Sequence, residues 1–285
     1  MSQSRAAFLD TSIQIARLIH SPETQVKIEN RLRQFDLKVT SLVVRQEYKR
    51  RLLKDAAYLL SLFDRYESFA KVHRHIVDVL TPFQRRKQKI SLQLLSTLFE
   101  DDSDSDLTSR AKLLLKGLLR DGLYEFDESV DHVIRESDCG CATQEVRRSG
   151  RRHKRYDFGV DKCNKGQGCG ISEFLDTRRE YLKTVLQYLE ALPDGRLTAE
   201  LRNAAAFIRS YLKNPGGVRS EDPCRKVGDL LIAMESVRIP IFYTMNGKES
   251  QHLCRTLDQC LIVRPSNPSK DDILCEPDQS EWPQF

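Results

Sequence analysis

Short apolar runs near the two ends of the chain constrain its fold more than any other feature. The first, at 6–9, ends at a polar turn that begins with Asp10 and is followed by apolar residues at helical spacing. A second run at 37–40 also precedes a helical pattern, and further runs at 239–243 and 260–263 have the composition of buried strands. Strands and helices that alternate in this way predict an α/β domain made of the two ends of the chain.

The long middle of the chain is predicted to be a mainly helical insertion. From residue 64 to about 135 the apolar positions follow helical spacing almost throughout, whereas 139–170 is rich in cysteine, glycine and arginine and has no apolar period. Helices are expected at 82–99, 107–119, 172–192 and 198–212. The predicted organisation is an N-terminal part of the domain at 1–63, the insertion at 64–220, a C-terminal part of the domain at 221–270 and a tail at 271–285.

Composition indicates a globular protein of the cytoplasm. The 46 Lys and Arg residues exceed the 41 Asp and Glu residues by five, and no stretch reaches the roughly 18 consecutive apolar residues that a membrane helix needs. Asp10 interrupts the apolar start of the chain before a signal-peptide core could form. We therefore expect no membrane partner, and we expect the eight cysteines to bind metal or to be small core residues rather than to form disulfides.

Three acidic residues stand where an α/β fold concentrates function. Asp10 follows the first expected strand, Glu47 lies on the helix after the second, and Asp229 lies on a helix before a later strand. Because parallel strands bind ligands beyond their carboxyl ends, these side chains can converge although they are far apart in the sequence. Clustered carboxylates favour Mg²⁺ or Mn²⁺, which can bind a phosphate oxygen and activate water. The alternative for each acid alone is a helix cap or a solvated helix position.

Four blocks of sequence resemble, in order and context, the motif series of the PIN-domain nucleases. They are Phe-Leu-Asp-Thr-Ser at 8–12, Val-Thr-Ser-Leu-Val-Val-Arg-Gln-Glu-Tyr at 39–48, Gly-Asp-Leu-Leu-Ile-Ala at 228–233 and Phe-Tyr-Thr-Met-Asn at 242–246. The resemblance covers about 6–63 and 221–265. It implies a three-layer α/β/α domain with a central parallel sheet, which the helical insertion interrupts.

The resemblance also implies a reaction, the metal-dependent hydrolysis of a phosphodiester bond. Asp10, Glu47 and Asp229 match the acids that bind catalytic Mg²⁺ or Mn²⁺ in the family, where a metal-activated water attacks and no protein nucleophile is needed. The expected enzyme is an endonuclease, and an endoribonuclease first of all. Its expected partner is nucleic acid, RNA rather than DNA, and the family also allows a protein partner such as an antitoxin-like regulator.

Four polar residues are expected to support this metal site or to contact the phosphate. Thr244 and Asn246 match the Thr-x-Asp/Asn element of the family, and Thr11 and Ser12 directly follow Asp10. Asn246 stands at a position that is often Asp in the family. This departure favours the alternative function, a catalytically silent PIN-like module for nucleic-acid binding or assembly.

Four of the cysteines form two close pairs separated by 21 residues. Four thiolates on two tight turns are what a tetrahedral structural zinc site requires, and zinc can fold a segment that is too polar to form a core. The C-x-C and C-x5-C spacings differ from the common C-x2-C, so thiols without metal, or a redox pair, remain as alternatives. The predicted Zn²⁺ ligands of this zinc-knuckle-like element are Cys139, Cys141, Cys163 and Cys169.

Between the two cysteine pairs lies a segment with six positive charges in nine residues, followed by Tyr156 and Phe158. A basic loop held at both ends by a metal and followed by aromatic residues suits phosphate contact and base stacking. A solvated loop is the alternative, and the same choice applies to the basic residues at 49–51. The expected nucleic-acid-binding residues are Arg147, Arg148, Arg151, Arg152, Lys154 and Arg155.

Overall fold

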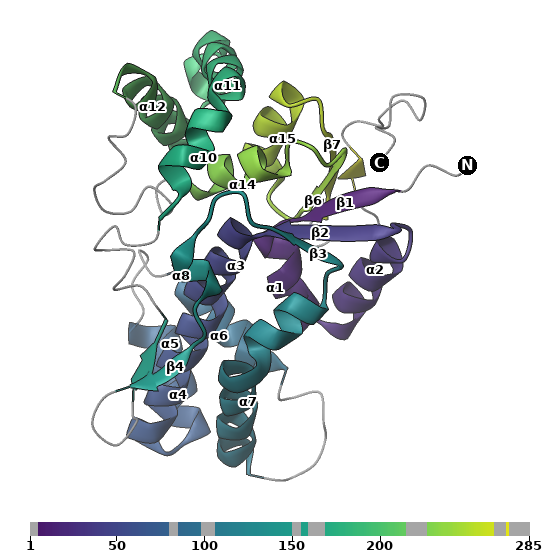
Figure 1. Ribbon diagram of the computed structural model, residues 1–285. Helices are drawn as coiled ribbons and strands as arrows, with labels where there is room; N and C mark the ends of the chain where they lie inside the picture. The colour runs from purple at the N-terminus through teal and green to yellow at the C-terminus, as the bar shows by residue number, and fades with distance from the viewer. Residues whose placement is uncertain are drawn as a thin grey trace.

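A central sheet joins the two ends of the chain (Figure 1). The structure, a computed structural model, describes residues 5–79, 85–97, 106–149, 155–158, 169–214, 227–264 and 272–273. Within these residues the sheet has the strand order β3-β2-β1-β6-β7-β8, and all its strands are parallel except β8, which is antiparallel to β7. The strands are β1 (Ala6–Leu9), β2 (Leu37–Ser41), β3 (His132–Ile134), β6 (Ile241–Thr244), β7 (Cys260–Val263) and β8 (Asp272–Ile273).

The apolar runs form strands because helices cover both faces of the sheet. All four residues of β1 are buried, as expected for a parallel strand with packed side chains on both sides. Phe8 pairs in register with Val39 and Phe242, and the Phe8 and Phe242 rings stack with their centroids 5.3 Å apart. Ala7 and Leu9 face the opposite side, where they pack with residues of α1 (Thr11–Ile19) and α2 (Pro22–Leu32). The predicted α/β class with a central parallel sheet is confirmed.

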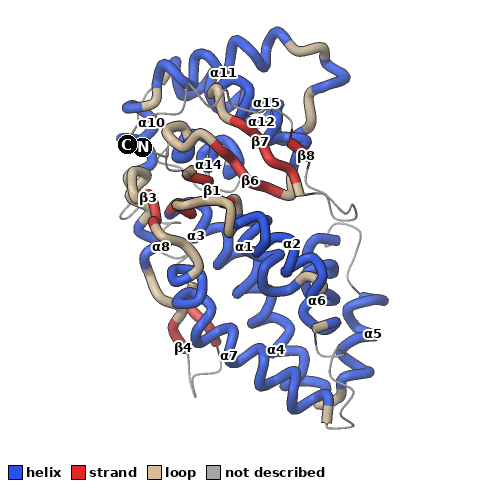
Figure 2. The backbone as a smooth tube through the Cα atoms, turned by 90° about the vertical axis from the view of Figure 1, so that its right-hand side faces the viewer, coloured by secondary structure: helices blue, strands red, loops and turns tan. Residues whose placement is uncertain are grey.

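Further helices lie on either side of this sheet (Figures 1 and 2). At the lower end, α4 packs against α5, α6 and α7, and at the upper end α11 packs against α12 and α15. The helices before the cysteine-rich segment are α3 (Leu42–Tyr48), the π-helical turn η1 (Lys49–Leu53), α4 (Lys54–Tyr66), α5 (Phe69–Val79), α6 (Arg85–Ser96) and α7 (Leu107–Glu128). After α8 (Gly140–Thr143), the helices are α10 (Ile171–Thr177), α11 (Arg179–Ala191), the 3-10 turn η4 (Asp194–Arg196), α12 (Ala199–Lys213), α14 (Gly228–Ser236) and α15 (Gly247–Thr256).

The structure departs from the sequence expectations inside the middle region. Residues 132–134, which were expected in a helical stretch, form β3 and join the sheet at its edge. The backbone of Asp131 donates to Lys38 O, and the Asp131 carboxylate accepts from Lys38 N, so the chain is fixed to β2 just before β3 begins. The helix expected at 172–192 breaks at Arg178, whose buried side chain turns to pair with Glu136.

No helix in the described part of the chain is long and apolar enough to cross a membrane.

Candidate active site

Asp10 is held at the carboxyl end of β1 by groups from its own turn and from β6. Its Oδ2 accepts hydrogen bonds from Ser12 Oγ at 2.7 Å and from Thr244 Oγ1 at 2.7 Å. These bonds form because β1 and β6 are parallel neighbours whose carboxyl ends meet. Asp10 also caps α1 by accepting from Ser12 N, so the helix-cap alternative and the site hypothesis are compatible.

Three of the four polar residues expected to support the site, Ser12, Thr244 and Asn246, belong to one network around Asp10. Ser12 Oγ accepts from Met245 N at 2.9 Å, and Thr244 Oγ1 accepts from the backbone N–H of Asn246 at 2.9 Å. Thr11 is directed elsewhere, because its Oγ1 donates to Glu47 Oε2 at 2.5 Å. The hydroxyl groups of Ser12 and Thr244 thus orient the Asp10 carboxylate, and that of Thr11 orients Glu47.

Glu47 lies on α3, which Ser41 caps through its side chain and the Val44 N–H. One Glu47 oxygen, Oε2, accepts the Thr11 hydrogen bond, and the other, Oε1, forms an ion pair with Arg51 one turn further on. A Cβ on Gly228 would lie 3.9 Å from Glu47 Oε1, so the start of α14 comes close to this carboxylate. Two segments that are far apart in the sequence therefore meet at Glu47.

Asp229 stands in the first turn of α14 and is electrostatically coupled to the other two acids. Its pKa is raised to about 7, first by burial and then by repulsion from Glu47 and Asp10, while Arg51 opposes the shift. Glu249 raises the pKa further. A carboxyl group responds in this way when neighbouring negative charges are incompletely compensated. Asp229 therefore lies close enough to Glu47 and Asp10 for their charges to act on it.

A cleft of about 220 Å³ opens between α12, α14 and α15, and we call it the acid cleft. Glu47 and Asp229 line it, and Glu249 and Glu200 supply further carboxylates. Arg51 is the one cation among the described residues that line it. Asp10 is not among these lining residues and acts on Asp229 from beside the cleft. The apolar part of the wall consists of Leu201, Ala204, Val227, Leu230 and Leu253.

The acid cleft contains residues that sequence reasoning missed. Arg51 follows Glu47 by four residues, a helical spacing that could have indicated an ion pair. Glu249 was visible only as the next acid after Asn246. Glu200 carries no local signal, because it reaches the cleft only through the docking of α12, which belongs to the predicted insertion.

The chemistry of the cleft fits a hard divalent cation, although no metal site is preassembled. Carboxylate oxygens are the donors that Mg²⁺ and Mn²⁺ prefer, and the raised pKa of Asp229 indicates negative charge that a cation would stabilise. In the part of the chain that the structure describes, however, no three His, Cys, Asp or Glu side chains are arranged to hold a metal ion. At Glu47, both oxygens already have partners.

The cysteine element, residues 139–170, brings two of the predicted zinc ligands together. Cys139 and Cys169 are joined by an isolated antiparallel β-bridge. A Cβ on Gly170 would lie 2.7 Å from Asp138 Cβ, so only glycine allows the two segments to approach this closely. Cys141 is buried beside Cys139, and Cys163 lies outside the described residues. The four-cysteine zinc site therefore stays a prediction.

The cysteine element is attached to the same helical segment that carries Glu47. Lys49 is fully buried, and its Nζ donates to Cys141 O at 2.6 Å and to Gln144 O at 2.7 Å. Burial first, and then the charge of Arg45, lower the pKa of Lys49 to about 8. Arg45 donates to Ala142 O and to both carboxylate oxygens of Asp127, at 2.8 and 2.9 Å. The alternative of a solvated basic face at 49–51 is therefore wrong for Lys49.

No family model, curated protein or solved structure matches the chain. The likeness to PIN-domain nucleases therefore remains a prediction from the four motif blocks. Any functional proposal depends on the acid cleft, the cysteine element and the surfaces beside them.

The basic segment between the cysteine pairs is described only in part. Arg147 and Arg148 are exposed on β4 (Arg147–Ser149), which pairs with β5 (Arg155–Asp157), and the Arg148 guanidinium lies 5.9 Å from the centroid of the Tyr156 ring. Phe158 is buried in the core, so its expected role in base stacking is wrong. The predicted residues Arg151, Arg152 and Lys154 lie outside the described residues.

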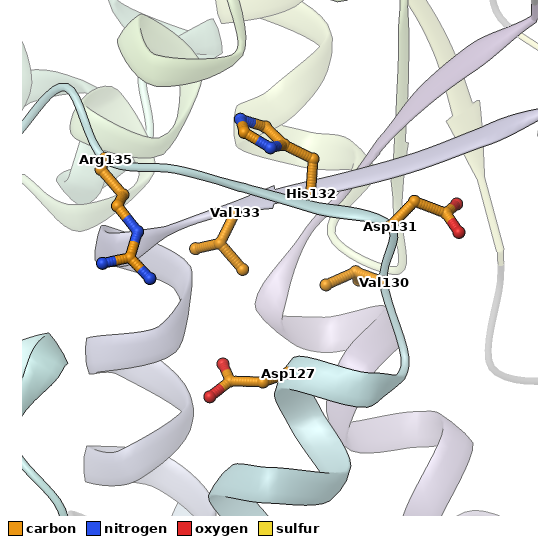
Figure 3. A pocket seen from close by; sticks show the side chains of 6 residues that line it. All are labelled: Asp127, Val130, Asp131, His132, Val133 and Arg135. Atoms are coloured by element: carbon orange, nitrogen blue, oxygen red, sulfur yellow. The ribbon is translucent and has the colours of Figure 1, made fainter.

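A second hollow, of about 300 Å³, lies beside β3 and contains none of the predicted site residues (Figure 3). Two of its carboxylates have structural partners: Asp127 binds Arg45, and Asp131 accepts from Lys38 N. The remaining lining residues are Val130, His132, Val133 and Arg135. The acid cleft is therefore the stronger candidate for chemistry.

Proposed function

We propose that this protein is a PIN-like endonuclease that hydrolyses phosphodiester bonds with Mg²⁺ or Mn²⁺. The observation that carries the proposal is the acid cleft, where carboxylates from separate parts of the chain act on one another beside the carboxyl ends of parallel strands. Such a concentration of negative charge destabilises a folded protein unless a cation neutralises it. A negatively charged substrate such as a phosphodiester can bind at this site only when a metal ion neutralises the charge of the carboxylates and of the phosphate.

Asp10, Glu47 and Asp229 are the residues that would hold the metal. When bound, a divalent cation supplies Lewis-acid chemistry, because it polarises the phosphate and lowers the pKa of water. Ser12 and Thr244 fix the Asp10 carboxylate by hydrogen bonds. Thr11 fixes Glu47 in the same way. These hydroxyl groups limit the rotation of both carboxylates and so reduce the entropy that ordering them would cost.

RNA is the proposed substrate class because of the exposed arginines on β4. Arg147 and Arg148 suit phosphate contact, and a base that displaces the Arg148 guanidinium could stack on the partly buried ring of Tyr156. Single-stranded or looped RNA presents such bases, whereas a duplex hides them. We therefore expect single-stranded RNA to be cleaved in preference to duplex DNA.

Cleavage assays with labelled RNA and DNA test this function. Wild type should cleave in the presence of Mg²⁺ or Mn²⁺, and Asp10→Asn should lose about a thousand-fold in rate, since a metal ligand supports several kcal/mol of transition-state stabilisation. Glu128→Gln, an exposed acid on α7, is the matched control and should keep full activity. Equal cleavage by wild type and Asp10→Asn would exclude the mechanism.

A catalytically silent nucleic-acid-binding module is the second candidate. The ion pair between Arg51 and Glu47 favours it, because a carboxylate compensated within the protein has less need of metal. Metal-dependent binding of RNA without any cleavage would select this candidate.

We also propose a structural zinc ion in the cysteine element, bound by Cys139, Cys141, Cys163 and Cys169. The bridge between Cys139 and Cys169 and the burial of Cys141 support it. Zinc there would hold both ends of the basic segment and so position it for nucleic acid.

A further inference from the structure

We propose that Arg51 is a resident counter-ion of the acid cleft, which a divalent cation must displace from Glu47 in order to bind. The inference rests on the proposed function only for the identity of the cation. It assigns to Arg51 a positioning role, because the guanidinium acts on metal binding through Glu47.

The contacts of Glu47 are the first observation. Its Oε1 is paired with Arg51 and its Oε2 accepts from Thr11, so the carboxylate has no oxygen without a partner. A metal that takes Glu47 as a ligand must share or replace one of these contacts. The Thr11 hydroxyl is neutral and does not oppose a cation at Glu47, whereas the Arg51 charge repels an incoming cation.

The second observation is the charge around Arg51. Among the described residues that line the cleft it is the one cation, and the carboxylates of Glu47, Asp229, Glu249 and Glu200 line the same cleft. Asp10 and Asp229 also act on its guanidinium electrostatically. Without Arg51 these acids would repel one another with no compensation inside the cleft. The arginine thus keeps the metal-free cleft folded and lowers its affinity for metal at the same time.

The geometry of the chain is the third observation. Arg51 lies on the π-helical turn, only two residues after Lys49, which is buried against the cysteine element. The side chain of Arg51 keeps about one third of its surface exposed, and that of Glu47 keeps 17%. The pair is therefore more enclosed than an ordinary surface ion pair, yet the guanidinium has solvent to move into. Single π-helical turns occur frequently at functional sites.

Direct measurement of Mn²⁺ binding tests the inference. Titrations followed by electron paramagnetic resonance would compare wild type with Arg51→Met, which keeps the apolar stem and removes the charge. We expect Arg51→Met to bind Mn²⁺ about ten-fold more tightly, and Arg51→Lys to lie between it and wild type. Arg50→Met is the matched control on the same turn and should bind as wild type does.

Thermal unfolding gives a second readout that does not depend on binding stoichiometry. In metal-free buffer Arg51→Met should unfold at a lower temperature than wild type, and Mn²⁺ should raise its unfolding temperature more than that of wild type. If Arg51→Met fails to fold without metal, recovery of folded protein when it is refolded with Mn²⁺ supports the inference. No recovery, together with Arg51→Lys binding no more tightly than wild type, overturns it.

Other outcomes separate this inference from the proposed function. Equal or weaker Mn²⁺ binding by Arg51→Met overturns the inference even if wild type cleaves RNA. Tighter binding by Arg51→Met supports the inference even if no variant cleaves RNA, a result that would refute only the proposed function. Absence of Mn²⁺ binding in both proteins overturns the inference.

Discussion

The acid cleft and the cysteine element lie against the same segment of the chain, residues 42–53, but they use its positive charges differently. On the side of the cysteine element, Lys49 donates to two backbone carbonyl groups, Arg45 donates to one such group and to the Asp127 carboxylate, and both side chains are almost completely buried. On the side of the cleft, Arg51 pairs with a carboxylate and keeps part of its surface in solvent. The first arrangement satisfies buried backbone carbonyl groups. The second neutralises the Glu47 carboxylate, which is a candidate metal ligand.

This difference separates structural from exchangeable cations. A lysine bonded to carbonyl groups in the interior cannot leave without exposing unsatisfied acceptors. An arginine paired with one of several clustered acids can be replaced by another cation. We therefore expect perturbations of the cysteine element to change stability and perturbations of the cleft to change metal binding.

Removal of the proposed zinc ion should have the largest effect on the stability of the cysteine element. We expect about one zinc ion per chain by emission spectroscopy, and we expect Cys141→Ser or a zinc-selective chelator to destabilise the cysteine element by up to about 10 kcal/mol, the scale of structural zinc sites. Cys254→Ala, at a buried position on α15, is the control, and this variant should keep its zinc. Protein that is purified without chelator and contains no zinc would refute the four-cysteine site.

Replacement of Lys49 tests the structural cation directly. Lys49→Ala leaves the carbonyl groups of Cys141 and Gln144 without their donor, so we expect a loss of about 3 kcal/mol in the free energy of unfolding by urea. The exposed Lys54→Ala should stay within about 0.5 kcal/mol of wild type. A variant that keeps its stability but loses Mn²⁺ binding would reverse the assignment of the two sides.

The buried Glu235 makes the stability of the fold around α3 depend on pH. It accepts from Val43 N in the first turn of α3, and burial raises its pKa from 4.5 to about 7, opposed by hydrogen bonds from Ser137 and Ser41. Between these pH values the folded state binds more protons than the unfolded chain, so its stability falls as pH rises.

Glu235→Gln should remove this pH-dependent loss, on the order of 2 kcal/mol, because the amide keeps an acceptor for Val43 N and carries no charge. Urea unfolding at pH 5 and pH 7.5 would measure the difference. The exposed Glu128→Gln should keep the slope of wild type, and an unchanged slope in Glu235→Gln would show that Glu235 is not the group responsible.

Contacts that follow from the order of the strands can be predicted from the sequence. Contacts that depend on how distant segments pack against one another cannot. The apolar runs indicate the strands at both ends of the chain, and the rule that parallel strands align their carboxyl ends brings Asp10 toward Thr244. Burial of Lys49 contradicts the usual behaviour of a charged residue and is stabilised by carbonyl groups about 90 positions away. Glu200 reaches the cleft only because α12 packs there. Neither contact leaves a local pattern.

The short strand β3 was missed in the sequence for a similar reason. The three residues of β3 are a strand because β2 offers an open edge, not because His132 or Val133 has a strong preference of its own. Phe158 follows a polar segment in the sequence, which suggested an exposed aromatic residue, but its side chain is buried in the core.

The π-helical turn at Lys49–Leu53 has a consequence for the evolution of the chain. It contains one residue more than an α-helical turn would use, and losing that residue would rotate everything on one side of it by about 100°. Lys49 would leave the cysteine element, or Leu52 and Leu53 would leave the core. A single-residue deletion here should thus be purged by selection, while deletions of similar size in the surface loops survive, and in any alignment with a relative that lacks the extra residue the gap belongs at this turn.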